Sequence, residues 1–158
     1  METEVMIVED DGLFRDLLRS SLSQHPSFNV VGCAPNGAEA VRMAQQQHVG
    51  VALMDIELGD DVNGIEVGRL IRMESPSTGI VLLSSHSNKE YLNAIPLDEA
   101  QGWSYLTKQS VSDLNVLTRA IEGAAVGLNV VDPVLVRSLR PGASTVLESL
   151  SPRQLEIL

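Results

Sequence analysis

The sequence predicts an α/β protein in which strands and helices alternate as (βα)5 and form a doubly wound, five-stranded parallel sheet. Three observations predict this fold. Short aliphatic and β-branched runs recur up to residue 107, with amphipathic segments between them. The runs at residues 50–54 and 79–83 are apolar without alternation, which is typical of strands covered by helices on both faces. The 158 residues, 44% hydrophobic and 20% charged, are enough to bury a core in one domain.

Each element follows from a local pattern. The five strands are expected at residues 5–8, 28–33, 50–54, 79–84 and 103–107. Apolar residues at i+4 spacing, such as Leu18 and Leu22, predict the helices between them. Asn36 with Glu39 three residues later predicts a helix start, and the run ending at Asp113 predicts the cap of the fifth helix. The fourth helical segment, residues 88–100, is less regular because it contains Pro96.

Charge and composition exclude several classes of protein. The formal net charge of −10 disfavours nucleic-acid binding by this chain alone, because an acidic surface repels the phosphate backbone. No apolar run is long enough to span a membrane, and the acidic N-terminus argues against a secretory signal. The single Cys33 excludes an internal disulfide and a cysteine zinc cluster. We therefore expect a cytoplasmic protein with no membrane partner.

Polar residues follow the predicted strands at the point where each strand ends. They are Glu9 and Asp10 after the first strand, Asp55 after the third, Ser84 at the end of the fourth and Lys108 after the fifth. In a parallel sheet these ends lie at one edge, where ligands bind. Clustered carboxylates repel one another by about 1–4 kcal/mol per pair, and an all-oxygen cluster suits Mg²⁺. With Lys108 and the Ser84 hydroxyl, this set could hold a phosphoryl group on a carboxylate nucleophile.

Each of these residues also has a purely structural explanation. Asp10 and Asp11 precede the first helix and could simply cap its amides. Asp55 could cap its own loop, and Lys108 could be a solvated loop lysine. Tyr105 could be a half-buried strand aromatic.

The motifs Val8-Glu9-Asp10-Asp11, Leu53-Met54-Asp55, Leu82-Leu83-Ser84-Ser85 and Tyr105-Leu106-Thr107-Lys108 occur in this order within residues 4–125. With these motifs the sequence resembles the receiver domain of two-component response regulators. The resemblance implies a flavodoxin-like or CheY-like sheet of strand order 2-1-3-4-5. It implies that Asp55 accepts a phosphoryl group from a sensor histidine kinase, and that the domain assists this step without being an enzyme on an external metabolite.

The resemblance also implies a role for each site residue. Mg²⁺ would be held by Glu9, Asp10, Asp55 and the backbone carbonyl of Glu57, whose side chain would tune dephosphorylation. Lys108 and Ser84 would contact the phosphoryl group. Ser84 and Tyr105 would act as the switch that changes the face formed by the fourth helix, fifth strand and fifth helix, through which a homodimer could form.

The C-terminal part resembles NarL/LuxR-type transcription regulators. Residues 129–139 resemble their linker helix, with a helix start at Asp132-Pro133, and residues 150–158 resemble the opening of their DNA-binding domain. We expect a receiver domain over residues 1–126, a linker with a short helix over 127–149, and the start of a truncated helix-turn-helix domain over 150–158. A helix is expected from Ser151-Pro152, and DNA would be bound only through the missing part.

The sequence departs from the family in several places. The acid pair is Glu9-Asp10 instead of two aspartates, the loop over residues 58–64 is one residue longer than usual, and Gln109 replaces the usual proline. The cis or trans state of the Lys108–Gln109 bond is therefore left open. Two alternatives remain: a receiver-like interaction module that works without phosphorylation, and a Mg²⁺-dependent phosphohydrolase.

Overall fold

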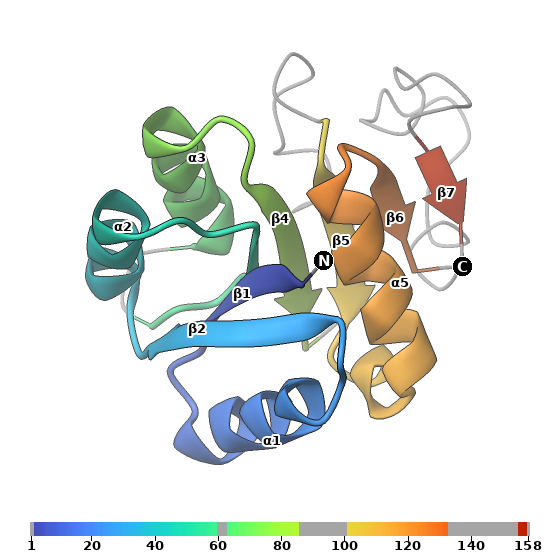
Figure 1. Ribbon diagram of the computed structural model, residues 1–158. Coiled ribbons are helices and arrows are strands. Elements are labelled where there is room, and N and C mark those ends of the chain that lie inside the picture. The colour runs from blue at the N-terminus through green and yellow to red at the C-terminus, as the bar shows by residue number, and fades with distance from the viewer. Residues whose placement is uncertain (1, 60–62, 86–100, 133–154, 158) are drawn as a thin grey trace, which may run out of the picture.

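The computed structural model describes residues 2–59, 63–85, 101–132 and 155–157. These residues form a central parallel sheet with helices packed against it (Figure 1). Over these residues the strand order is β2-β1-β3-β4-β5-β6-β7, and all neighbouring strands are parallel. The strands are Thr3–Val8 (β1), Phe28–Ala34 (β2), Val51–Asp55 (β3), Gly79–Ser84 (β4), Trp103–Thr107 (β5), Asn129–Val131 (β6) and Leu155–Ile157 (β7). The predicted order of the first five strands is confirmed.

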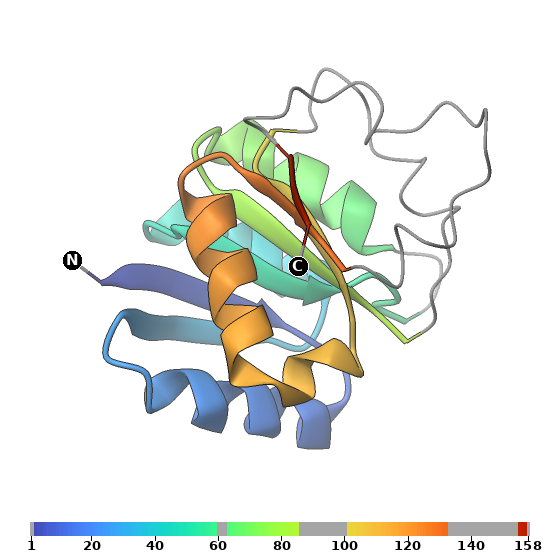
Figure 2. The ribbon, with the colours of Figure 1, turned by 90° about the vertical axis from the view of Figure 1, so that its right-hand side faces the viewer.

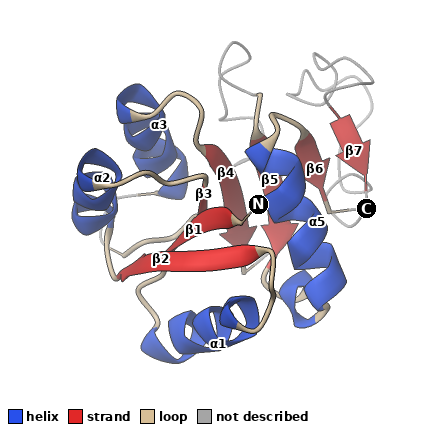
Figure 3. Cartoon of the chain, in the orientation of Figure 1, coloured by secondary structure: helices blue, strands red, loops and turns tan. Residues whose placement is uncertain are grey.

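Helices cover both faces of the sheet (Figures 1 and 3). Their bounds are Gly12–Ser23 (α1), Gly37–Gln46 (α2), Gly64–Glu74 (α3) and Leu114–Ala125 (α5), with a 3-10 turn at Ser110–Ser112. Helices α1 and α5 lie on one face, and α2 and α3 lie on the other (Figure 2). The predicted fourth helix falls outside the described residues. No helix in the described part of the chain combines the length and the apolar character needed to cross a membrane.

Alternate residues of each strand feed two separate cores. In β1, Val5 and Ile7 pack with α1 and α5, whereas Met6 and Val8 pack with α2 and α3. All four side chains are fully buried, and burial of each stabilises the fold by about 1.5–3 kcal/mol. This two-sided burial explains why the strands read as continuous apolar runs in the sequence.

Every described α-helix begins with a side-chain cap. The caps are Asp11 for α1, Asn36 for α2, Asn63 for α3 and Asp113 for α5. Their side-chain oxygens accept hydrogen bonds from amides of the first helical turn, each contributing about 1 kcal/mol. The helix starts predicted at Asn36 and Asp113 are confirmed.

The C-terminal part differs from the prediction in two places. The sheet was expected to have five strands, but β6 and β7 extend it beyond β5. Residues 129–131 therefore form a strand within the expected linker, and residues 155–157 form a strand where a helix from Ser151-Pro152 was expected. The reason is that the edge of β5 offers backbone partners to β6, and β6 to β7, and such pairing overrides weak local signals. The expected helix from Pro133 to Leu139 lies outside the described residues.

Candidate functional site

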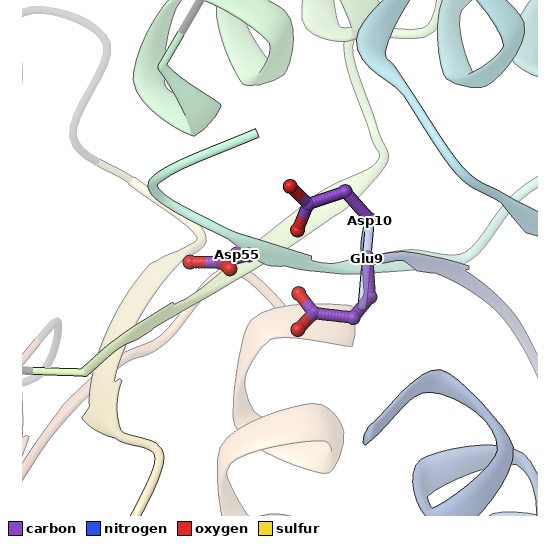
Figure 4. A group of neighbouring side chains, drawn as sticks. All are labelled: Glu9, Asp10 and Asp55. Carbon is purple, nitrogen blue, oxygen red and sulfur yellow. The ribbon is translucent and has the colours of Figure 1, made fainter. Parts of the chain in front are cut away.

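The polar residues predicted at the strand ends converge in the structure. Strand β1 pairs with β3 so that Val8 lies beside Met54, which places the residues that follow Val8 close to Asp55. Figure 4 shows the carboxyl groups of Glu9, Asp10 and Asp55 around a common space. One oxygen from each lies within 4.8 Å of the others. The register of a parallel sheet thus builds a three-carboxylate cluster from two short sequence motifs.

Glu9 is the most buried member of this cluster. Its side chain is 1% exposed, and its Oε1 accepts a hydrogen bond of 2.7 Å from Lys108 Nζ. Its other oxygen, Oε2, is also buried and has no hydrogen-bond partner within the described part of the chain. A buried oxygen without a partner costs about 1–3 kcal/mol, so this atom is a ready ligand for a cation. Burial raises the pKa of Glu9 from 4.5 to about 7; the Lys108 hydrogen bond opposes this rise and Asp55 adds to it.

Asp55 lies at the end of β3 with 4% of its surface exposed. Its Oδ2 is 2.9 Å from Lys108 Nζ, and its Oδ1 accepts a hydrogen bond of 3.0 Å from the backbone N–H of Glu57. The amide of Ile56 continues the pairing with β4 by donating to the Leu83 carbonyl at 2.9 Å. The carboxylate is therefore held firmly by the strand end and by the loop that follows it.

Lys108 is the cation shared by Glu9 and Asp55. Burial alone would lower the pKa of Lys108, but its hydrogen bonds to Glu9 and Asp55 outweigh burial and raise it. Its Nζ also lies 4.7 Å from the centre of the Phe14 ring, a cation–π distance. Its backbone N–H donates to the Ser84 carbonyl at 2.8 Å, which joins the ends of β4 and β5. These contacts show that Lys108 is not a solvated loop lysine.

Asp10 is exposed and is not the cap of α1. The cap is Asp11, whose Oδ1 accepts hydrogen bonds from Leu13 N at 3.0 Å and Phe14 N at 3.4 Å. The alternative that both aspartates merely cap the helix therefore applies to Asp11 only. Gly59, with φ 93°, lies in the loop after β3. This loop comes close to Asp10, since a Cβ placed on Gly59 would lie 3.9 Å from Asp10 Oδ2.

The cluster fits a hard divalent cation. When all three carboxylates are ionised, they and the one ammonium leave two negative charges at this edge of the sheet. All candidate ligand atoms are oxygens, and Mg²⁺ prefers carboxylate oxygens together with water and phosphate. The acidic pocket predicted from the sequence is therefore present.

The remaining predicted residues lie in β4, in β5 and in the loop after β3. Ser84 ends β4 with 2% exposure, beside Thr107 of β5. Tyr105 is 1% exposed and packs in the core under α2 and α3, so it is not half-buried. Glu57 is exposed two residues after Asp55. No cis peptide bond occurs among the described residues, so Lys108–Gln109 is trans.

Comparison with known proteins identifies the family. Residues 5–122 match the response regulator receiver domain. The chain belongs to this family. It is 32% identical over 160 residues to the transcriptional regulatory protein LiaR of Bacillus subtilis (strain 168), covering 98% of this chain and 74% of LiaR. It is 29% identical over 136 residues to the transcriptional regulatory protein DegU of Brevibacillus brevis, covering 86% of this chain. The match spans 56% of the length of DegU.

A solved structure gives the same answer. The receiver resembles a two-component response regulator of the LuxR family from Aurantimonas sp. SI85-9A1 with a TM-score of 0.70 and 26% identity. The match covers 80% of this chain and 87% of that one. Together with LiaR, it confirms the predicted resemblance to LuxR-type regulators.

The structure adds residues to the receiver site that the sequence did not predict. Phe14 contacts the ammonium of Lys108, and the Nη1 of Arg15 donates to the Glu9 carbonyl at 2.9 Å. Both lie in the first turn of α1, directly after the acidic run, so their position in the sequence could have suggested them. Asp132 accepts hydrogen bonds from Thr107, the residue before Lys108. Because Thr107 is remote from Asp132 in the sequence, no local pattern indicated this contact.

Proposed function

We propose that this receiver accepts a phosphoryl group on Asp55 from a sensor histidine kinase, and that phosphorylation controls a DNA-binding domain following it in a transcription regulator. One observation carries the proposal. The buried Asp55 carboxylate lies 2.9 Å from Lys108 Nζ and within 4.8 Å of the acids that follow β1. A carboxylate nucleophile, a counter-cation and a metal-binding acid pair are the groups that phosphoryl transfer to a carboxylate requires.

The transfer forms one bond and breaks one bond. An oxygen of Asp55 attacks the phosphorus, while the bond from phosphorus to the leaving group, a histidine nitrogen or the acetate oxygen of acetyl phosphate, breaks. Lys108, beside the Asp55 carboxylate, balances the added negative charge, and the Ser84 hydroxyl donates to a phosphoryl oxygen. Mg²⁺ held by Glu9, Asp10, Asp55 and the Glu57 carbonyl would supply positive charge at the phosphoryl oxygens.

Phosphorylation then alters the signalling face. The new group carries about two negative charges and draws Ser84 and Lys108 toward it. Tyr105 lies in the same strand as Thr107, the partner of Ser84, so its ring can follow this movement. The face formed by the fourth helix, β5 and α5 would change and could form a homodimer.

The remaining parts of the proposal concern the longer protein. DNA would be bound only by a domain that continues from residues 150–158, after a linker over 127–149, and the acidic receiver would not contact DNA itself. The match to LiaR over 98% of this chain supports an output in transcription. We place the protein in the cytoplasm, and the receiver is no enzyme on an external metabolite.

The test is phosphorylation by acetyl phosphate, with and without Mg²⁺, read by intact mass. The expected result is a Mg²⁺-dependent gain of one phosphoryl group that Asp55→Asn does not show. Asp113→Asn is the matched control, because it changes a carboxylate that only caps α5. A folded, metal-binding protein that gains no phosphoryl group would favour a phosphorylation-independent module. Repeated turnover of a phosphomonoester would instead indicate a phosphohydrolase.

A further inference from the structure

Asp132 is a buried carboxylate that the proposed phosphoryl chemistry does not use. It follows strand β6, lies beyond the family match at residues 5–122, and is 2% exposed. Its Oδ2 accepts hydrogen bonds from Thr107 N at 3.3 Å and Thr107 Oγ1 at 3.0 Å. The same oxygen accepts a third hydrogen bond from Ser110 Oγ. Three donors from Thr107, the last residue of β5, and from Ser110 thus converge on one carboxylate oxygen.

These donors flank Lys108 on both sides. Thr107 precedes Lys108, and Ser110 follows it by two residues. The two are also joined to each other, because Ser110 N donates to Thr107 Oγ1 at 3.3 Å. The Lys108 backbone is fixed in turn to the Ser84 carbonyl. Hydrogen bonds to Asp132 therefore fix the backbone on both sides of Lys108, whose ammonium contacts Asp55.

We propose that Asp132 is a positioning residue for Lys108, and that it couples the phosphoryl site to strand β6 and the chain that follows. This inference rests on the proposed function. When Lys108 moves toward a phosphoryl group on Asp55, residues 107–110 move with it and the Asp132 hydrogen bonds weaken. Coupling is reciprocal, so loosening β6 at Asp132 must also alter how Lys108 is placed.

The alternative is that Asp132 merely attaches β6 to the sheet. The chain offers a matched control, because side chains also attach β6 at its other end. Asn129 Oδ1 accepts from Gly102 N at 3.3 Å, and Ser104 Oγ accepts from Val130 N at 2.9 Å. Asn129→Ala therefore loosens β6 without touching residues 107–110.

The first measurement needs no phosphorylation. The NMR resonances of the Lys108 side chain and the exchange rate of the Thr107 amide are compared in wild type, Asp132→Asn and Asn129→Ala. Asp132→Asn should shift the Lys108 resonances and speed Thr107 exchange at least about tenfold, whereas Asn129→Ala should leave both near wild type. Unchanged Lys108 resonances in Asp132→Asn, or equal changes in the two variants, would overturn the proposal even if Asp55 proved unable to accept a phosphoryl group.

The second measurement is the rate of phosphorylation by acetyl phosphate with Mg²⁺. Asp132→Asn should slow it by about threefold or more through misplacement of Lys108, and Asn129→Ala should not. In wild type, phosphorylation should in turn speed Thr107 amide exchange; an unchanged exchange rate would refute the coupling. If Asp132→Asn does not fold, Ser110→Ala removes a single donor and should give smaller effects in the same directions.

Discussion

Glu9 should make the stability of the metal-free protein depend on pH. Its pKa is about 7 in the folded state and 4.5 when unperturbed, so between these values the folded protein binds more protons than the unfolded chain. Stability therefore falls as pH rises through this window. The shift corresponds to a ceiling of about 3 kcal/mol, with a slope of at most about 1.4 kcal/mol per pH unit. Glu9→Gln removes the titrating group and should remove this slope.

The assay is urea unfolding at several values between about pH 5 and about pH 8 with a chelator present. Other groups titrate in the same range, so the informative quantity is the difference between wild type and Glu9→Gln at each pH. Relative to the variant, wild type should lose stability steadily as the pH rises. Parallel curves would show that Glu9 is ionised throughout and that its burial beside Asp55 does not favour the protonated form.

Three further predictions concern the same edge of the sheet. Mg²⁺ must displace the Glu9 proton, so its affinity by calorimetry should rise between about pH 6 and about pH 8, and a flat profile would contradict this. Phe14→Leu removes the ring 4.7 Å from Lys108 Nζ and should slow phosphorylation about two- to fivefold, while Phe14→Tyr keeps a ring and should not; equal rates in both would refute the cation–π role. Gly64→Ala forces a Cβ against the Asp55 carbonyl oxygen and should cost about 1–3 kcal/mol in urea unfolding, whereas Gly12→Ala, with nothing nearer than 3.6 Å, should cost less than about 1 kcal/mol.

The acidic pocket could be predicted from the sequence because parallel strands follow a simple rule. Residues that come after the carboxyl ends of such strands share one edge, so Glu9, Asp55 and Lys108 had to meet if the strands were assigned correctly. The apolar runs fixed those assignments without reference to any contact. The rule does not predict that Asp11 caps α1 while Asp10 joins the carboxylate cluster, because this depends on the local backbone at the start of α1.

The apolar spacing of α1 does not show which of its leucines are buried. Leu13 and Leu17 belong to the apolar spacing of α1, yet they are 84% and 58% exposed. Leu18 and Leu22 carry the contact with the sheet instead. A hydrophobic pattern shows that a helix is amphipathic, but the width of the covered stripe depends on neighbouring elements that the pattern does not describe.

The C-terminal strands were missed for a different reason. Strand β6 has three residues, too few for any periodic signal, and Asp132 before a proline resembles an ordinary helix start. The buried Asp132 carboxylate accepts hydrogen bonds from Thr107 and Ser110, which are more than twenty residues away in the chain. Local propensity contains no information about such partners, so only the assembled sheet reveals them.

The charges of the pocket link metal binding to phosphorylation. When all three carboxylates are ionised they face one lysine, which leaves two negative charges unbalanced; at pH values below about 7 the Glu9 proton removes one of them. The proposed phosphorylation would replace the single charge of Asp55 by about two and deepen this deficit. A phosphoryl group without the cation would therefore be repelled by Asp10 and by ionised Glu9, while a divalent cation alone would balance the fully ionised pocket. Glu9 Oε2 is buried and has no hydrogen-bond partner among the described residues, so it could serve as a cation ligand, and we expect a divalent cation to bind before the phosphoryl group.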